Sequence, residues 1–217
     1  MKKNEKALEI YKRLQKIYPD AHCELDHKNG WELLIATILS AQCTDVRVNM
    51  VTPHLFKKYP TAAKLAKAEQ LDVEEIIHST GFYKNKAKSI ISCSAEIVSR
   101  FKNEIPKSIE ELSSLAGVGR KTANVVLGNI YNINEGVVVD THVKRLSFLL
   151  GLTKNTEPEK IEPELMKLFP QDTWCMLSHL LIFHGRRICI ARRPQCDLCV
   201  LNDICPSAGK NKLAPKK

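Results

Sequence analysis

Apolar residues recur along almost the whole chain at the three- and four-residue spacing of helices that are buried on one side. The stretch that starts at Trp31, WELLIATILSAQ, is apolar nearly all round, which predicts a helix in the centre of a domain. Near the amino end, one stripe of an amphipathic helix is predicted at Leu8, Tyr11, Leu14 and Tyr18. Further helices are predicted at 47–58, 61–67, 72–79, 84–101, 108–115, 120–130, 141–150, 157–168 and 173–183.

Residues of the types that start and stop helices stand at the ends of these segments. Thr61 and Ser108 occupy positions where N-caps belong. Three glycines occupy positions where helices stop, namely Gly81, Gly117 and Gly151. The segments are therefore separate helices joined by short connections.

The only run with strand character is VVVD at 137–140, and no second run is available to pair with it. The predicted fold class is therefore all-α. With 217 residues and 44% hydrophobic content, the chain can form one or two domains. The basic end, KNKLAPKK at 210–217, is predicted to be a disordered tail.

Lys and Arg number 33 against 24 Asp and Glu, which gives a formal net charge of +9. Such an excess favours an anionic partner, most often nucleic acid, although a solvated basic face would give the same count. No run of about 18 apolar residues is present, so no transmembrane helix is predicted. The amino end has no apolar signal-peptide core, so we expect the protein to stay in a reducing cytosol.

Four of the eight cysteines lie close together, as Cys189, Cys196, Cys199 and Cys205, with the pattern C-x6-C-x2-C-x5-C. Four thiolates in one loop-rich segment require a metal centre that offsets their repulsion. A zinc site usually pairs two short C-x2-4-C hooks, and one is present here. A four-iron, four-sulfur cube takes wider gaps and often has a proline after the last ligand, as Pro206 does. The spacing therefore favours iron–sulfur over zinc, with disulfides third.

The remaining cysteines are scattered among apolar residues and are predicted to be ordinary buried thiols: Cys23, Cys43, Cys93 and Cys175. Arg192 and Arg193 lie between the first two clustered cysteines, on a loop that a metal centre would hold rigid. Guanidinium groups on such a loop suit phosphate contacts, the alternative being two solvated arginines.

A tight turn between two helices is predicted within LAGVGRKTANVVLGN at 115–129. Gly117 and Gly119 supply backbone conformations closed to other residues, and we expect the amides of 118–120 to be left bare. The positive end of the following helix points the same way. This pattern predicts a helix-hairpin-helix that binds a DNA phosphate without recognising the base sequence. The alternative is a tight turn between two helices that binds no ligand.

Lys121 lies in the first turn of the second hairpin helix, beside Arg120. The helix dipole and the neighbouring guanidinium both disfavour the ammonium form, so we expect an amine that can form a Schiff base with a sugar carbon. The alternative is a cation that only contacts the phosphate. Asp140 opens a later helix, where N-capping is its simplest role, but its carboxylate could also face Lys121 and stabilise charge developing on a deoxyribose ring.

Together and in this order, these segments resemble the endonuclease III family of DNA glycosylases. The resemblance covers about residues 5–206. Its matching stretches are LLIATILSAQCTDVRVN, TGFYKNKA, LAGVGRKTANVVL, VVDTHVKR, HGRRICIARRPQC and the four clustered cysteines.

The resemblance implies two helical lobes. One is a six-helix barrel at 23–133 that carries the hairpin at about 108–130, and the other is discontinuous, made of 1–22 and 134–217. The loop 189–205 of the second lobe would hold a structural [4Fe–4S] cluster through its four cysteines. The active site would lie in the groove between the lobes.

By the same resemblance, Lys121 is the nucleophile and Asp140 its essential carboxylate. Gln42 fills the hole left by a flipped nucleotide, and Phe82 stands at the wedge position, where an aliphatic residue is common. The full set of implied DNA contacts is Gln42, Phe82, Gly117, Val118, Gly119, Thr122, Arg192 and Arg193.

Three further residues match positions at the damaged-base pocket: Ser40, Asp45 and His142. The alternative for His142 is a first-turn helix residue bonded to backbone. Cys43 stands where the family usually has a smaller residue such as alanine.

The implied function is that of a base-excision-repair enzyme. It would remove oxidised or ring-saturated pyrimidines by Schiff-base chemistry and then nick the strand by β-elimination, without a soluble cofactor or catalytic metal. Its partner would be double-stranded DNA with damaged pyrimidines or abasic sites. We expect a monomer associated with the nucleoid in a bacterial cytoplasm.

Three rival functions remain to be compared. Monofunctional glycosylases of the same fold lack a lysine at the hairpin position, so Lys121 argues against them. A non-catalytic helix-hairpin-helix DNA-binding module explains the charge and the turn, but not Lys121 together with Asp140. A redox protein would have a centre that is readily reducible without DNA, and the hairpin and basic loop argue against it.

Overall fold

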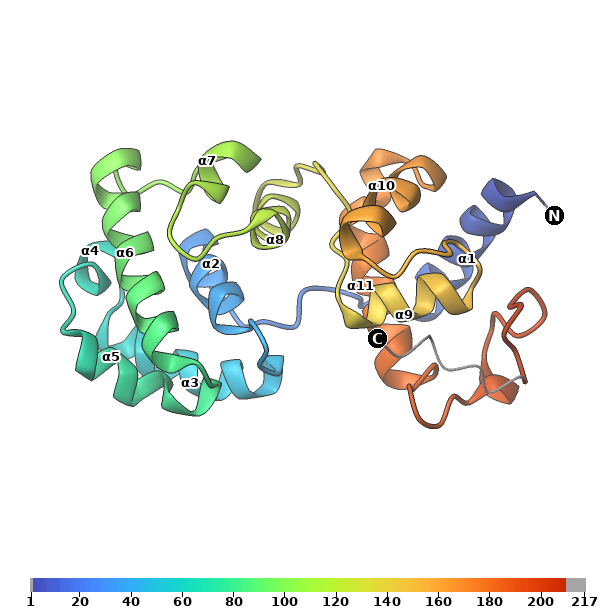
Figure 1. Ribbon diagram of the computed structural model, residues 1–217, viewed down its shortest axis with the longest axis horizontal. Helices are drawn as coiled ribbons and strands as arrows, with labels where there is room; N and C mark the ends of the chain where they lie inside the picture. Colours follow the sequence, from blue (N-terminus) through green and yellow to red (C-terminus); the bar gives the residue numbers. More distant parts are fainter. Residues whose placement is uncertain (1, 210–217) are drawn as a thin grey trace. The chain divides into compact units, whose positions relative to one another are not determined.

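The computed structural model describes residues 2–209, and within that range the chain is helical with no strand, which confirms the predicted all-α class. Two compact units divide the chain (Figure 1). The central unit is residues 23–133. The terminal unit joins the two ends of the described chain, 2–22 and 134–209. The predicted basic tail at 210–217 lies outside the described residues.

The central unit is built around one apolar helix. Its helices are α2 (Gly30–Leu39), α3 (Asp45–Lys58), α4 (Ala62–Leu65), α5 (Gln70–Ile77), the 3-10 turn η1 (His78–Thr80), α6 (Tyr83–Phe101), α7 (Ile109–Ser113) and α8 (Arg120–Tyr131). Every residue from Trp31 to Leu39 is buried, as the all-round apolar sequence predicted. Helix α2 packs against α3, α6 and α8, so it forms the middle of this core (Figure 1).

Short polar side chains start four of these helices. The side chain of each N-cap accepts a hydrogen bond from the backbone N–H three residues on, and the caps are Asn29, Thr44, Thr61 and Ser108. These bonds satisfy amides that have no partner inside the helix. The N-caps predicted at Thr61 and Ser108 are thereby confirmed.

The terminal unit brings together segments that are far apart in the sequence. Its helices are α1 (Lys3–Ile17), α9 (Thr141–Leu149), α10 (Pro158–Leu168), the 3-10 turn η2 (Gln171–Thr173), α11 (Trp174–Arg187) and the 3-10 turn η3 (Cys196–Leu198). Helix α11 packs against both α1 and α9, and α1 also contacts α10. The amino-terminal helix therefore belongs to a core whose other helices come from the second half of the chain.

The stripe predicted for the amino-terminal helix is confirmed at Leu14 and Tyr18, which are buried, and wrong at Leu8. Leu8 is 39% exposed, whereas Ala7, Ile10 and Leu14 are fully buried against the terminal core. Both stripes have helical spacing, so periodicity alone does not separate them. Packing of the terminal core buries Ala7 and Ile10 in place of Leu8.

The strand-like run 137–140 is not a strand. It is an irregular segment in which Val137 and Val139 are buried in the terminal core, and it leads directly into α9. Among the described residues, no helix has the length and apolar character needed to span a bilayer.

Candidate functional site

The hairpin predicted at 115–129 is present in the central unit. Helix α7 ends at Ser113, a short turn follows, and α8 begins at Arg120 and packs against α7. Gly117 has a φ of 75°, in the left-handed region, and Gly119 is the extended N-cap of α8. The predicted conformation closed to other residues is therefore confirmed for Gly117 and wrong for Gly119, whose extended backbone any residue can adopt.

The structure excludes a side chain at Gly117 but not at Gly119. A Cβ atom at Gly117 would lie 2.7 Å from Cβ of Ser89 on α6, so both its φ and its packing exclude a side chain. A Cβ atom at Gly119 would meet nothing within 4 Å, and its φ of −98° is open to any residue. Folding therefore explains Gly117, while Gly119 leaves an open space beside the start of α8.

The start of α8 is the part of the hairpin with free amides. No side chain caps this helix, and among the described residues the amides of Gly119, Lys121 and Thr122 donate to no protein acceptor. The expectation that residues 118–120 are all bare is wrong for Val118, whose amide donates to the carbonyl of Leu115 at 3.1 Å. That bond closes the turn, and the Val118 side chain is buried in the core. Uncapped helix amides attract anions because they add to the positive end of the helix dipole.

Lys121 and Thr122 occupy the first turn of α8. The Lys121 side chain is exposed and Thr122 is half-buried. An amine at this place stands next to the open amides, so it is accessible to an anionic ligand seated there.

Gln42 and Phe82 share a rare backbone conformation. Gln42 follows the end of α2 with a φ of 53°, and Phe82 precedes α6 with a φ of 49°. Both side chains are exposed, and the ring of Phe82 is 65% accessible. Left-handed backbone costs a non-glycine residue about 1 kcal/mol or more, and such strain concentrates at functional sites. Folding alone does not call for an exposed phenylalanine in a strained turn.

Asp140 is the N-cap of α9. Its Oδ1 accepts a hydrogen bond of 2.7 Å from the amide of Val143, so the capping role considered from the sequence is real. Its Oδ2 has no hydrogen-bond partner among the described residues, and the side chain is half-buried. Asp140 belongs to the terminal unit and Lys121 to the central unit, and the facing of the two side chains stays a prediction.

The three residues predicted for a base pocket lie at helix ends. Ser40 is the C-cap of α2, and its hydroxyl donates to the carbonyl of Thr37 at 2.9 Å. Asp45 is the first residue of α3. His142 is in the first turn of α9, where its ring approaches Gly185 of α11 so closely that a Cβ atom there would lie 2.8 Å from its Nδ1. Their role in binding a base stays a prediction.

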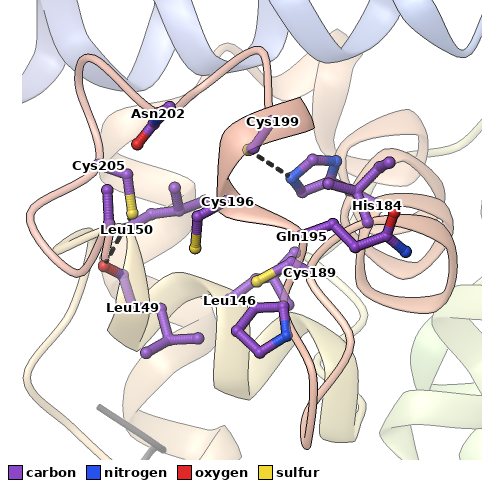
Figure 2. A pocket seen from close by; sticks show the side chains of 13 residues that line it. Leu146, Leu149, Leu150, His184, Cys189, Gln195, Cys196, Cys199, Asn202 and Cys205 are labelled. Carbon is purple, nitrogen blue, oxygen red and sulfur yellow. Dashed lines mark hydrogen bonds between the residues drawn. The ribbon is translucent and has the colours of Figure 1, made fainter. Parts of the chain in front are cut away.

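The four clustered cysteines line one cavity of the terminal unit. Figure 2 shows Cys189, Cys196, Cys199 and Cys205 around it. Leu146, Leu149 and Leu150 of α9 supply its apolar wall. The segment between the cysteines has little regular structure beyond η3, so loops place the four cysteine side chains around the cavity.

Polar contacts reach the sulfurs of Cys199 and Cys205 and the carbonyl oxygen of Cys189. His184 Nε2 lies 3.3 Å from Cys199 Sγ, and Cys205 Sγ lies 3.7 Å from the carbonyl oxygen of Leu149 (Figure 2). The Leu201 amide donates to Cys199 Sγ at 3.4 Å. Arg145 donates to the carbonyls of Gly185 and Cys189 at 3.1 and 2.7 Å. A metal-bound thiolate only accepts hydrogen bonds, so the donors around Cys199 suit a ligated sulfur, whereas Cys205 Sγ contacts a carbonyl oxygen as a free thiol does.

The other ring nitrogen of His184 also has a hydrogen-bond partner. Its Nδ1 lies 3.0 Å from the hydroxyl of Tyr18, and the ring is 2% exposed. Burial, helped by the charge of Arg145, lowers the pKa of His184 to about 4, so the ring is neutral near pH 7. With the ring proton on Nε2 facing Cys199, Nδ1 accepts from Tyr18, which orients the ring for the sulfur.

The donor set fits a metal–sulfur group because four sulfurs from one short segment line the same cavity, although among the described residues no three of them stand as ligands of a single metal ion. Burial raises the pKa of Cys189 to about 11, the nearby Arg145 lowers it, and the other three cysteines raise it. Four thiolates in this cavity would therefore repel one another unless a cationic centre offset their charge.

The other cysteines differ from the expectation in part. Cys93 is buried, as expected, but Cys23, Cys43 and Cys175 are only half-buried. These three lie near the ends of helices or in connections, where the apolar neighbours in sequence do not all become neighbours in space. Among the predicted phosphate contacts, Arg192 and Arg193 are exposed on the loop between the first two clustered cysteines.

Sequence reasoning missed three residues that support these sites: His184, Arg145 and Lys86. For Lys86 a signal was present, because it stands on the apolar stripe of α6 with Ile90 and Ile97. For His184 and Arg145 no local signal exists, since their partners are distant in the sequence.

Comparisons with known proteins agree with this geometry. The family model for the HhH-GPD superfamily of base excision DNA repair proteins matches residues 35–171. A second model, for the iron-sulfur binding domain of endonuclease III, matches residues 189–205. The prediction of an iron–sulfur cluster over zinc or disulfides is thereby confirmed.

Individual relatives are similar over almost the whole chain. Endonuclease III of Synechocystis is 55% identical over 206 residues, which cover 95% of this chain and 94% of that protein. A solved non-covalent endonuclease III–DNA complex is 41% identical with a TM-score of 0.90, covering 97% of this chain and 98% of the other. A trapped endonuclease III–DNA covalent intermediate is also 41% identical, with a TM-score of 0.91 and coverage of 97% and 99%.

The hairpin glycines should respond differently to substitution. We expect Gly117→Ala to lower the free energy of unfolding by about 2–4 kcal/mol, because the new methyl group meets Ser89 and the left-handed backbone is strained. Gly119→Ala should change it by less than about 1 kcal/mol, since the space there is open. Urea unfolding followed by circular dichroism measures both, and equal losses would contradict this assignment.

The four-cysteine cavity should determine the iron content. We expect the purified protein to contain about four iron atoms per chain and to absorb in the visible range, and Cys196→Ala to lose most of both. Cys175→Ala is the matched control, because this cysteine lies outside the cavity and should keep the iron. Metal analysis that found zinc in place of iron would refute the expectation.

Proposed function

Since this chain belongs to the endonuclease III family and is a base-excision DNA glycosylase and lyase, we propose that its substrates are oxidised or ring-saturated pyrimidines in duplex DNA. After removing the base it nicks the strand 3′ of the abasic site. The observation that carries the proposal is the exposed Lys121 amine beside the uncapped start of α8. An anion seat next to a nucleophile is what attack on a deoxyribose flanked by phosphates requires.

The hairpin positions the DNA backbone. A phosphate accepts hydrogen bonds from the free amides of Gly119, Lys121 and Thr122, and the open space at Gly119 lets it approach the chain. This contact reads no base, so it works at any sequence. The exposed Arg192 and Arg193 add further phosphate contacts.

The damaged nucleotide leaves the base stack, because C1′ cannot be reached inside a duplex. A saturated pyrimidine stacks poorly, so its extrusion costs less than that of a normal base. Gln42 fills the vacated space and Phe82 enters the stack from its strained turn. Ser40, Asp45 and His142 line the pocket that receives the base.

The chemistry proceeds through a covalent link to Lys121. Its Nζ attacks C1′, the glycosidic bond breaks, and the base leaves as an anion that takes a proton from water. Asp140 stabilises the positive charge that develops on the sugar and accepts the proton that the amine loses, using the oxygen not engaged in the cap. The C1′–O4′ bond then breaks and O4′ takes the proton that Asp140 had accepted, which leaves a Schiff base between C1′ and Nζ.

Strand cleavage follows from the Schiff base. The iminium acidifies the C2′ proton, and once that proton is removed, the bond from C3′ to the 3′ phosphate oxygen breaks by β-elimination. Water then hydrolyses the imine and frees Lys121. Cys189, Cys196, Cys199 and Cys205 would hold the [4Fe–4S] cluster, and with the cluster bound the arginine loop would be kept in one conformation.

One chain is expected to act alone on DNA, and the natural substrate is the chromosome, which would place the protein at the nucleoid of a bacterial cytoplasm. The bacterial relatives and the basic net charge of +9 support this setting.

Replacing the nucleophile tests the proposal directly. We expect wild-type protein to form a borohydride-stable adduct with a duplex that contains an abasic site, and Lys121→Gln to form none, because an amide cannot make the imine. Lys12→Gln, on the exposed face of α1, is the matched control and should react normally. An adduct that persists in Lys121→Gln would refute the assignment, and its absence in wild type would favour the non-catalytic DNA-binding module.

Asp140 can be tested for chemistry separately from capping. Asparagine caps helices about as well as aspartate, so Asp140→Asn should keep the free energy of unfolding within about 1 kcal/mol. Base excision in single turnover should nevertheless fall by about 10²–10⁴-fold, since the carboxylate charge is gone. Asp140→Ala should lose stability as well as activity. Normal excision by the asparagine variant would show that Asp140 is only a cap.

A further inference from the structure

We propose that Lys86 is a positioning residue that ties together the two turns carrying Gln42 and Phe82, so that both side chains can enter the duplex at one lesion. The inference rests on the proposed function, in which these two side chains replace the extruded nucleotide. It concerns a residue that takes no part in the covalent chemistry.

The link is made by the ammonium group of Lys86. Its Nζ donates to the carbonyl of Leu39 and to the carbonyl of Thr80, each at 2.8 Å. Leu39 is the last residue of α2, and Thr80 is the last residue of η1. The two carbonyl oxygens are therefore at most twice that distance apart, although they are far apart in sequence. One side chain joins the ends of two helical segments.

Each joined carbonyl immediately precedes a turn that ends in a strained residue. Gln42 comes three residues after Leu39 and has a φ of 53°. Phe82 comes two residues after Thr80 and has a φ of 49°. The intervening Gly81 has φ 70° and ψ 156°, a combination open almost only to glycine. Short, strained turns keep their shape only when the surrounding structure holds their ends.

Lys86 also holds the second turn through its backbone. Its amide donates to the carbonyl of Phe82 at 3.1 Å, while its side chain holds the carbonyl of Thr80. The segment from Thr80 to Phe82 is thus bonded on both sides of Gly81 by the same residue. The Thr80 hydroxyl adds a bond of 2.8 Å to the carbonyl of Ile77, which fixes the start of the segment.

Packing alone does not explain a lysine at this position. The side chain is 6% exposed, and no carboxylate pairs with it among the described residues. Burial lowers the pKa of Lys86, with an opposing effect of the neighbouring Cys43, and Lys86 is the fourth residue of α6, near the positive end of that helix. On the same stripe, Ile90 and Ile97 are apolar. An apolar side chain would fill the space at lower electrostatic cost, so the two carbonyl bonds are the reason for the ammonium.

A fixed spacing of the two turns matters because their side chains act on one duplex together. If both turns are already fixed before DNA binds, no conformational entropy is lost in ordering them when the base is extruded. Single-stranded DNA has no opposite base and no stack to re-form, so it does not need either side chain. The role of Lys86 should therefore depend on whether the substrate is a duplex.

The test compares borohydride trapping on two abasic-site substrates, one duplex and one single-stranded, with Lys86→Met. Methionine keeps most of the buried stem and removes the ammonium group. We expect trapping on the duplex to fall by about tenfold or more and trapping on the single strand to stay within about twofold of wild type. A merely structural role would lower both equally.

Three further variants control for other effects. Lys88→Met removes an exposed lysine of the same helix and should leave the ratio of duplex to single-strand trapping unchanged. Ile90→Val lowers stability on the same stripe without touching either turn, so it should also keep the ratio. Lys86→Arg retains a donor for two carbonyls and should restore most of the duplex reaction. If Lys86→Met is insoluble, Lys86→Gln is measured in its place.

The outcomes separate the two proposals. If wild type traps neither substrate, the chemistry assigned to Lys121 is wrong. If wild type traps both and Lys86→Met loses both equally, or loses neither, the positioning role of Lys86 is overturned while the chemistry stands. A selective loss on the duplex that Lys86→Arg reverses supports the positioning role.

Discussion

The structure of this protein depends on finding hydrogen-bond partners for the backbone amides and carbonyls at its helix ends. A chain built only of helices with short connections has many ends, and each leaves several amides or carbonyls without partners inside the helix. In the central unit, Asn29, Thr44, Thr61 and Ser108 cover four of the helix starts. The start of α8 is left open, and an open helix start attracts an anion. The starts of α5 and α6 also lack a side-chain cap, so it is the open space at Gly119 beside the free amides that distinguishes α8.

The same constraint explains the buried lysine. The carbonyls that end α2 and η1 meet inside the central unit, away from solvent, and Lys86 supplies donors to both. The rigid apolar helix α2 then does more than fill the core, because it carries one of the two strained turns at its end. Stability of the core and precision of the turns are thus linked through one ammonium group.

In the terminal unit, segment 189–205 depends on its cofactor for a fixed conformation, because it has little regular secondary structure. The segment 189–205 has one short 3-10 turn and many exposed residues, so its own packing cannot hold it. Its four cysteines converge on a cavity walled by α9, with His184 and Arg145 bonded to a sulfur and a carbonyl of the cluster loop. A metal–sulfur group there joins the loop to the helices, and the loop in turn presents its arginines.

Short-range chemistry made much of the molecule predictable: helical spacing, N-caps at Thr61 and Ser108, the left-handed glycine of the hairpin and the cysteine spacing all act within a few residues. What only the tertiary structure decided depends on partners distant in sequence. It selected the buried stripe of α1, used the Val118 amide to close the turn, and brought Lys86 and His184 to their acceptors. Local pattern specifies which groups need partners, and only packing of the whole unit decides which partners they find.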